Sequence, residues 1–171
     1  MSYRRIKPLI SVGFSMVDLP DARHYVNGEW RSAGAEQIAV ENPATEDELT
    51  NIPVATASVV EDAFDAAEQA QSEWASRPGI ERATVLREIG SVVEEHADDI
   101  AEIITAEQGK PLASARGEVT ATADLAEYVA GWGRRLEGDI VPSDNRDEQI
   151  NLQRHPMGVV AGIIPWNYPI S

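Results

Sequence analysis

The chain has 171 residues, of which 43% are hydrophobic and 25% are charged, and this balance indicates a globular domain with a core of its own. Its formal net charge of -15 argues against nucleic acid as a partner, because contact with phosphates requires a basic surface. The sequence contains no cysteine, which excludes disulfides, thiolate metal sites and a cysteine nucleophile within these residues.

The choice of cationic residue is unusual. Of the 14 Lys and Arg residues all but two are arginine, and the two lysines are Lys7 and Lys110. A surface rich in acids and poor in lysine resembles that of proteins from salt-loving organisms, in which salt screens the repulsion between like charges. An ordinary acidic cytosolic protein is the alternative. No stretch reaches the roughly 18 consecutive apolar residues of a membrane span, and no secretory signal pattern is present, so we expect a cytoplasmic protein without a membrane partner.

Residues 1–20 are predicted to form a flexible amino-terminal extension. The first 15 residues carry Arg4, Arg5 and Lys7 without any acidic residue, whereas the sequence after Met16 turns acidic. These residues are therefore either a tail or upstream sequence that precedes a true start at Met16.

Residues 24–40 predict a β-hairpin region. Aromatic and β-branched residues flank two turn signals, Asn27-Gly28 and a Ser-Ala-Gly loop. A polar loop, ENPATEDE, follows, in which Pro43 disfavours helical geometry at the residue before it. The next residues, LTNIPVAT, predict a short extended piece.

Three helical blocks are predicted after this piece. The first begins with a capping box at Ser58 and ends at SRPG. The second runs over 81–108 with a break near His96, and Gly109 is its expected C-cap. The third runs from about 112 to 136 and places its larger apolar residues on one side.

After Gly138 the hydrophobic pattern changes to that of strands. DIVPS and QINLQRH each predict a short strand, so residues 138–155 are expected to form a β-hairpin. GVVAGII, at 158–164, is a continuous apolar run of the kind found in central strands of parallel sheets. The parallel strands that it would pair with are missing from the sequence. The predicted fold is therefore α/β with an incomplete sheet, and either another chain supplies the other strands or this chain is a fragment.

Several polar patterns are interpreted as structural. His24, His96 and His155 lie far apart and lack the spacing of metal ligands, so no metal site is predicted. Paired carboxylates in the second helical block are interpreted as part of a solvated face. GWGRRL lacks both a third glycine and a preceding strand, and is not a dinucleotide fingerprint.

The last residues, PWNYPIS, follow the predicted core strand. Ligands of open α/β sheets bind beyond the carboxyl ends of the strands, so Pro165 and Trp166 would lie at such a place. Asn167 would then offer an amide N–H to a developing oxyanion, and the apolar residues before it would form a wall for a flat ring. A proline-bounded turn with Trp166 packed into the core is the alternative.

These segments together resemble the aldehyde dehydrogenase superfamily. EQGKPL with ARGEV and the terminal PWNYP, in register, are the most specific motifs, and TAEQGKPLASARGEV is most similar to the succinate-semialdehyde dehydrogenase branch. The resemblance extends from Tyr25 to Ser171, and its segments, in the family's order, are YVNGEW, ENPATED, ERATVLREIG, EQGKPLASARGEV, YVAGWGRRLEGDIVPS and HPMGVVAGIIPWNYP.

The resemblance implies an activity and a cofactor. Residues 21–171 would be part of an NAD(P)-binding domain that contains a helical layer and the first strand of a Rossmann-like parallel sheet. The implied reaction is oxidation of a small-molecule aldehyde to a carboxylic acid with NAD or NADP, through a cysteine thiolate and a water activated by a glutamate. Family members are dimers or tetramers, so we expect a homo-oligomer and assign residues 138–155 to its assembly.

The resemblance also implies roles for residues at the end of the chain. Asn167 matches the asparagine that holds the oxyanion, and the residues that match the border of the cofactor site are Ile163, Ile164, Pro165 and Trp166.

One departure from the family limits these expectations. Family members are much longer, and their nucleophile, their glutamate and further cofactor contacts lie beyond the position of Ser171. We therefore expect the isolated chain to be an inactive fragment of the enzyme. The alternative is a shortened, non-catalytic homologue that serves as a helical interaction or oligomerisation module.

Overall fold

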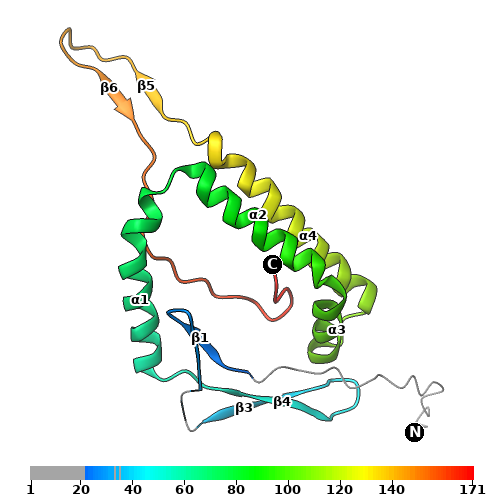
Figure 1. Ribbon diagram of the computed structural model, residues 1–171. Helices are drawn as coiled ribbons and strands as arrows, with labels where there is room; N and C mark the ends of the chain where they lie inside the picture. The colour runs from blue at the N-terminus through cyan, green and yellow to red at the C-terminus, as the bar shows by residue number, and fades with distance from the viewer. Residues whose placement is uncertain (1–21, 33, 35) are drawn as a thin grey trace, which may run out of the picture.

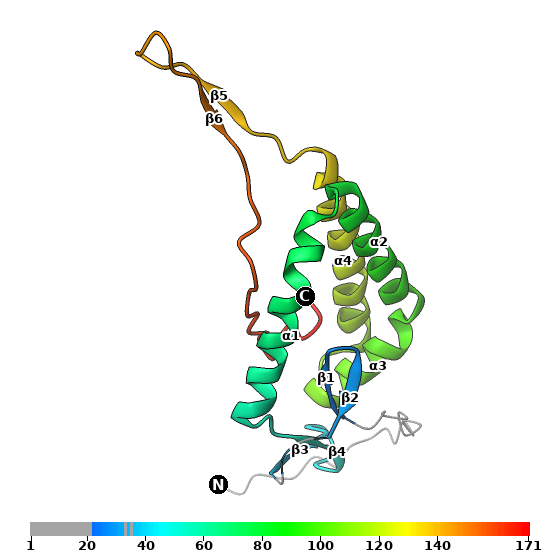
Figure 2. The ribbon, with the colours of Figure 1, turned by 60° about the vertical axis from the view of Figure 1, so that its left-hand side comes forward.

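The computed structural model describes residues 22–32, 34 and 36–171, so the predicted extension at 1–20 lies outside the described residues. In the described part, helices and short strands combine as expected for an α/β fold with an incomplete sheet, since the strands form three separate antiparallel pairs. Figures 1 and 2 show α2 and α4 side by side, α1 apart from them, and the hairpin of β5 and β6 extending away from the helices.

The amino-terminal strands form two hairpins. β1 (His24–Val26) pairs with β2 (Glu29–Arg31) across Asn27 and Gly28, whose φ values of 53° and 80° are those of a type I′ turn. This part of the predicted hairpin region is confirmed. β3 (Gln37–Glu41) pairs with β4 (Glu48–Pro53), the predicted extended piece, so the region at 24–40 contains three strands and the last of them belongs to a second hairpin.

Helix α1 (Ala57–Ser76) begins two residues earlier than predicted, because its N-cap is Thr56 rather than Ser58. The side-chain oxygen of Thr56 accepts a hydrogen bond from the main-chain N–H of Val59 at 3.4 Å, which satisfies one of the free donors of the first turn. Both hydroxyl residues fit a capping pattern, and the structure uses the first of them. The two hydroxyls also lie 2.9 Å apart.

Replacing Thr56 by alanine is expected to lower the free energy of unfolding by about 1 kcal/mol, because the capped N–H loses its acceptor. Replacing Ser58 by alanine keeps that acceptor and is expected to cost clearly less. Urea unfolding of the two variants, followed by circular dichroism, compares them directly. A larger loss for the Ser58 variant would mean that the predicted capping box forms after all.

The remaining helices follow the predicted pattern closely. α2 (Gly79–Glu95) and α3 (Ala97–Gln108) are separated at His96, as predicted, and Gly109 ends α3 in the left-handed region with a φ of 73°. α4 (Leu112–Ala130) is shorter than predicted, because the chain continues as a 3₁₀-helix, η1 (Gly131–Arg134).

The core lies between α3 and α4 and is built from small residues. Its buried members are Ala97, Ala101, Ile104, Ala115 and Val119. Close approach also joins α2 to η1, where a Cβ on Gly79 would lie 2.5 Å from the carbonyl oxygen of Gly133. Helices without large core side chains pack at short distance and bury little apolar area each, so much apolar surface remains exposed.

The carboxyl-terminal third contains both strands of the predicted hairpin. β5 (Asp139–Val141) pairs antiparallel with β6 (Ile150–Leu152). Residues 158–164, predicted as a core strand whose partners the sequence lacks, are unpaired as expected; they have no regular secondary structure in this chain, and Ile163 is 95% exposed. A parallel strand is stable only beside neighbouring strands, and none of the described residues supplies one.

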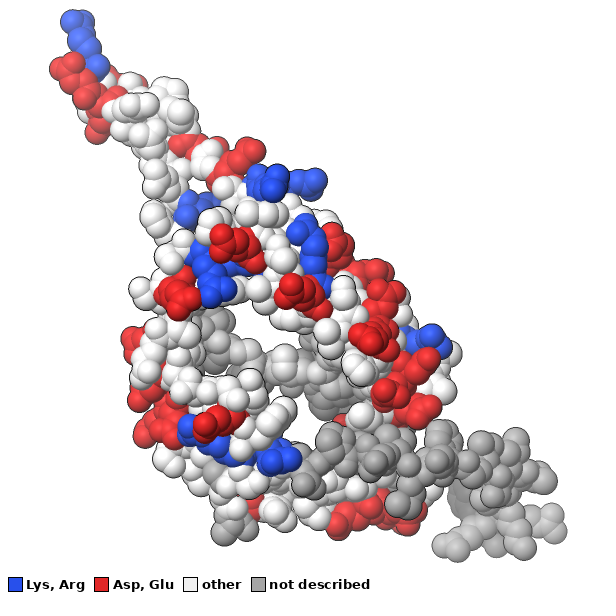
Figure 3. Space-filling model, viewed as in Figure 1, with Lys and Arg blue, Asp and Glu red and all other residues white. Residues whose placement is uncertain are grey.

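Acidic side chains are spread over the helices, with arginines between them (Figure 3). Several of these charges pair at the surface, for example Arg87 with Glu127 at 3.1 Å between α2 and α4. Exposed pairs of this kind contribute little to stability. Among the described helices, none is long and apolar enough to cross a membrane.

Candidate functional site

The last seven residues fold back as two successive turns. The N–H of Tyr168 donates to the carbonyl of Pro165 at 3.4 Å, and the N–H of Ser171 donates to the carbonyl of Tyr168 at 3.3 Å. Trp166 and Asn167 occupy the central positions of the first turn. The proline-bounded turn of the alternative interpretation is therefore present, but Trp166 is 81% exposed and is not packed into the core.

Three side chains from the junction of α3 and α4 hold this double turn, and we call them the anchor: Gln108, Lys110 and Glu118. Gln108 donates to the carbonyl of Trp166, and the Lys110 ammonium donates to the carbonyl of Asn167 at 2.8 Å. Glu118 accepts from the N–H of Ile170 at 3.3 Å. In Figures 1 and 2 the chain after β6 returns past α1, and these contacts fix its end beside α3 and α4.

Local geometry explains how the anchor forms. Gly109 takes a left-handed conformation between Gln108 and Lys110, so the chain reverses sharply where α3 ends and α4 begins. Glu118 lies in the second turn of α4, facing the same junction, and forms an ion pair with Lys110. The contacts to Trp166, Asn167 and Ile170 use main-chain atoms, so the exposed side chains of Trp166 and Asn167 remain available.

The ion pair of the anchor is the most buried charge pair among the described residues. The Glu118 side chain is 2% exposed and the Lys110 side chain 16% exposed. The Lys110 ammonium also lies 4.4 Å from the centre of the Tyr168 ring, a cation–π contact. Next to Gln108, partial burial raises the pKa of the Glu107 carboxyl above its ordinary value.

The residues before the turn present an exposed apolar surface. Ile163, Ile164 and Trp166 are all exposed, and Pro165 lies between them. Contiguous apolar exposure of this kind marks a surface that binds a ligand or another part of a protein. Its composition is that of one side of a site for a flat, apolar ring, and Asn167, which is also exposed, follows it directly.

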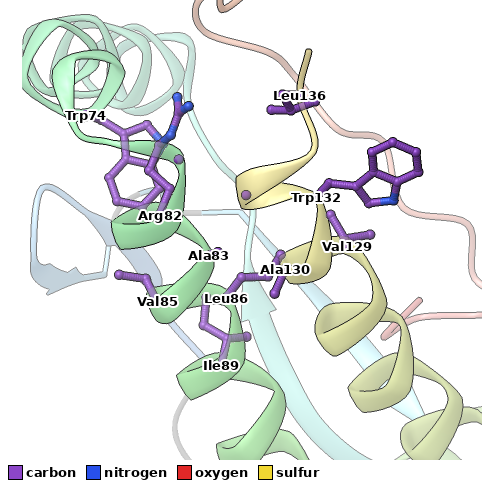
Figure 4. A pocket seen from close by; sticks show the side chains of 12 residues that line it. Trp74, Arg82, Ala83, Val85, Leu86, Ile89, Val129, Ala130, Trp132 and Leu136 are labelled. Carbon is purple, nitrogen blue, oxygen red and sulfur yellow. The ribbon is translucent and has the colours of Figure 1, made fainter.

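A separate cavity of about 510 Å³ lies on the helical part of the molecule (Figure 4). It is formed by Trp74 of α1, by α2, the end of α4 and η1, and by Leu136 after η1, and Arg82 is the only titratable side chain in its lining. The cavity holds no nucleophile and no acid, so it offers binding surface rather than chemistry. Within the described ranges, no group of His, Asp and Glu is arranged to hold a metal ion.

The sequence profile of the aldehyde dehydrogenase family matches residues 30–171. The chain belongs to this family, which confirms the resemblance seen in its motifs. Among curated relatives, it is 42% identical over 147 residues to the NADP-dependent succinate-semialdehyde dehydrogenase of Escherichia coli, and 45% identical over 148 residues to the lactaldehyde dehydrogenase of the same organism. Each alignment covers 85% of this chain and 30% of the relative.

Solved structures agree with this assignment. A 3,6-anhydro-L-galactose dehydrogenase in complex with NAP superposes with a TM-score of 0.82 at 41% identity, over 88% of this chain and 32% of the other. An aldehyde dehydrogenase from Brucella melitensis biovar abortus 2308 superposes with a TM-score of 0.85 at 37% identity, over 92% of this chain and 33% of the other. The chain thus spans about a third of the length of the proteins that it matches.

The sequence interpretation found part of this site and missed the rest. Asn167 and the apolar residues before it were predicted, and in the structure they are exposed, with Trp166 and Asn167 in the turn that begins at Pro165. The motifs EQGKPL and ARGEV, which contain Lys110 and Glu118, indicated the family but no role for either residue. A signal was present, because Lys110 is one of only two lysines in a chain that otherwise uses arginine.

Proposed function

We propose that this chain is the amino-terminal portion of an NAD(P)-dependent aldehyde dehydrogenase, and that the complete enzyme oxidises an aldehyde to a carboxylic acid. Membership of the family supports the reaction class. The observation that carries the proposal is the anchored turn, which presents the side chain of Asn167 directly after an exposed apolar segment.

Asn167 is proposed to stabilise the oxyanion that develops on the aldehyde carbon. Lys110 binds the main-chain carbonyl of Asn167 and not its side chain. The exposed side-chain amide can therefore donate a hydrogen bond to substrate. A donor that is already oriented costs no reorganisation when charge develops, and this is what makes such groups effective.

Ile163, Ile164, Pro165 and Trp166 are proposed to border the cofactor. NAD(P)⁺, when bound, accepts the electrons that the aldehyde loses. The contribution of these four residues is an exposed apolar surface against which a flat ring can lie.

The proposed substrate is a short aldehyde that carries a second polar group. The names of the relatives support this class, since they include succinate-semialdehyde, lactaldehyde and glutarate-semialdehyde dehydrogenases. We propose succinate semialdehyde as the first substrate to test.

The complete enzyme is proposed to be a homo-oligomer, a dimer or tetramer, that uses the hairpin within 138–155 for assembly. The hairpin stands away from the helices (Figure 1), and Ile140, Val141 and Leu152 expose apolar side chains on it. Short antiparallel strands of this kind gain stability when their exposed edge or face is covered.

A non-catalytic module is the second candidate, and the exposed apolar residues of the helices favour it. The DNA that follows the codon of Ser171 separates the two. A continuing frame with a cysteine codon supports the enzyme, whereas a stop codon together with folded 171-residue protein supports the module.

The reaction is tested in what we call the parent enzyme: this chain joined to the remaining part of the family's length, from its own continuing frame or from the E. coli succinate-semialdehyde dehydrogenase as a chimera. We expect reduction of NAD or NADP when succinate semialdehyde is added, measured by the absorbance of the reduced nicotinamide. Lactaldehyde and glutarate semialdehyde serve as competing substrates. Failure of all three aldehydes to reduce either nucleotide would contradict the proposal.

A further inference from the structure

Lys110 makes three different contacts with a single ammonium group. It pairs with the Glu118 carboxylate, donates to the carbonyl of Asn167 at 2.8 Å, and lies 4.4 Å from the centre of the Tyr168 ring. We propose that Lys110 and Glu118 are positioning residues, which set the direction of the Asn167 side chain by holding the main chain at Asn167 itself and at Ile170. This inference rests on the proposed role of Asn167.

The three contacts suit a lysine and not an arginine. An ammonium group has three donors in a tetrahedral arrangement, so it can meet a carboxylate, a carbonyl and a ring face that do not share a plane. A guanidinium is flat, and its donors lie in one plane. Only two of the 14 basic residues are lysine, so the use of lysine at this position stands out from the composition.

Glu118 uses its two oxygens separately. Oε2 pairs with Lys110, and Oε1 accepts the N–H of Ile170 at 3.3 Å. The pair therefore binds the main chain at Asn167 and again at Ile170, three residues later. Ile170 also packs against the core between α3 and α4, so the contact at Ile170 is tied to that core.

Burial of the pair indicates more than a gain in stability. Removing two charges from water costs about as much as their attraction returns, so a buried ion pair adds little net stability over apolar side chains of similar volume. What the pair does provide is one defined geometry for the turn. The Asn167 side chain is exposed and is not held by packing, so its direction depends on the main chain that carries it.

The test variant replaces both partners at once, Lys110→Met with Glu118→Gln, in the parent enzyme. Removing both charges avoids leaving one of them buried without a partner. We expect kcat to fall by about 10- to 100-fold, because displacement of a catalytic group by about 1 Å has effects of this size. The Kd of the nucleotide and the midpoint of thermal unfolding are expected to change little.

A second measurement separates positioning from general stabilisation. If the pair acts through Asn167, the double variant will lower kcat in the normal background but will have little further effect when Asn167 is already alanine. Amide hydrogen exchange gives a readout independent of activity, and we expect faster exchange in the peptide 165–171 but unchanged exchange in α1.

One matched control and one further test variant use residues of the same region. Arg116→Met removes an exposed ion pair with Asp98, 2.7 Å long, from the same helix as Glu118 and is expected to leave kcat unchanged. Lys110→Arg keeps the charge but not the tetrahedral donors, and is expected to lower kcat as well. It also provides the test if the double variant does not fold.

Two results would overturn the inference: an unchanged kcat in the Lys110 variants, or a loss of kcat that is equally large in the Asn167→Ala background. Unchanged turnover in Asn167→Ala itself would instead refute the proposed role of Asn167, so the two failures are distinguishable.

Discussion

Replacing Asn167 by alanine in the parent enzyme is expected to lower kcat by about 10²- to 10³-fold, the usual loss when one oxyanion donor is removed. The nucleotide should still bind, because its proposed border consists of the residues before Asn167. Steady-state kinetics with saturating nucleotide measures the first effect, and a fluorescence titration with the reduced nucleotide measures the second.

Two further variants sharpen this test. Asn167→Asp has nearly the same shape but places a carboxylate oxygen where the donor was, so it is expected to lower kcat at least as much as alanine does. Asn51→Ala removes an exposed asparagine from β4, away from the turn and from the proposed assembly hairpin, and is expected to have no effect on kcat. Normal turnover in Asn167→Ala would exclude Asn167 from the chemistry.

Replacing Gly79 by alanine is expected to give the largest loss of stability among the glycines of the helical region. The added Cβ would lie 2.5 Å from the carbonyl oxygen of Gly133, a main-chain atom that moves only if η1 moves. Overpacking of this kind costs about 1–3 kcal/mol. Urea unfolding of the 171-residue chain measures the change.

Gly117 provides a matched control with the opposite sign. It lies inside α4, and a Cβ there would meet no other atom within 4 Å. Gly117→Ala is therefore expected to raise the free energy of unfolding by about 0.5–1 kcal/mol, because alanine favours the helix. Equal effects of the two substitutions would mean that the contact between Gly79 and η1 does not form in solution.

Local signals explain which elements could be predicted from the sequence. Asn27-Gly28 defines a tight turn, and Gly109 ends a helix, because each signal acts over a few residues. The N-cap was misplaced from Thr56 to Ser58 since two hydroxyl residues compete within one turn, and only the main-chain path decides between them.

Elements that depend on distant partners could not be predicted. The run at 158–164 has the composition of a buried strand, but whether it becomes one depends on neighbours that the described residues do not contain. In the same way, Lys110 and Asn167 are 57 residues apart, and no periodicity connects them. The sequence therefore predicted the asparagine and its apolar neighbours, but not the side chains that hold them.

The unpaired segment at 158–164 has a consequence for the order of folding. It is tethered at both ends, by the hairpin of β5 and β6 on one side and by the anchor on the other, so part of its conformational freedom is already lost. In the enzyme that we propose, the first neighbouring strand to form would pair with the segment at 158–164. Because the ends of this segment are already held, pairing would cost less conformational entropy. Until that strand forms, the free main-chain N–H and C=O groups of the segment can also pair with a second copy of the chain. Folding of the enzyme and aggregation therefore compete for the same main-chain groups.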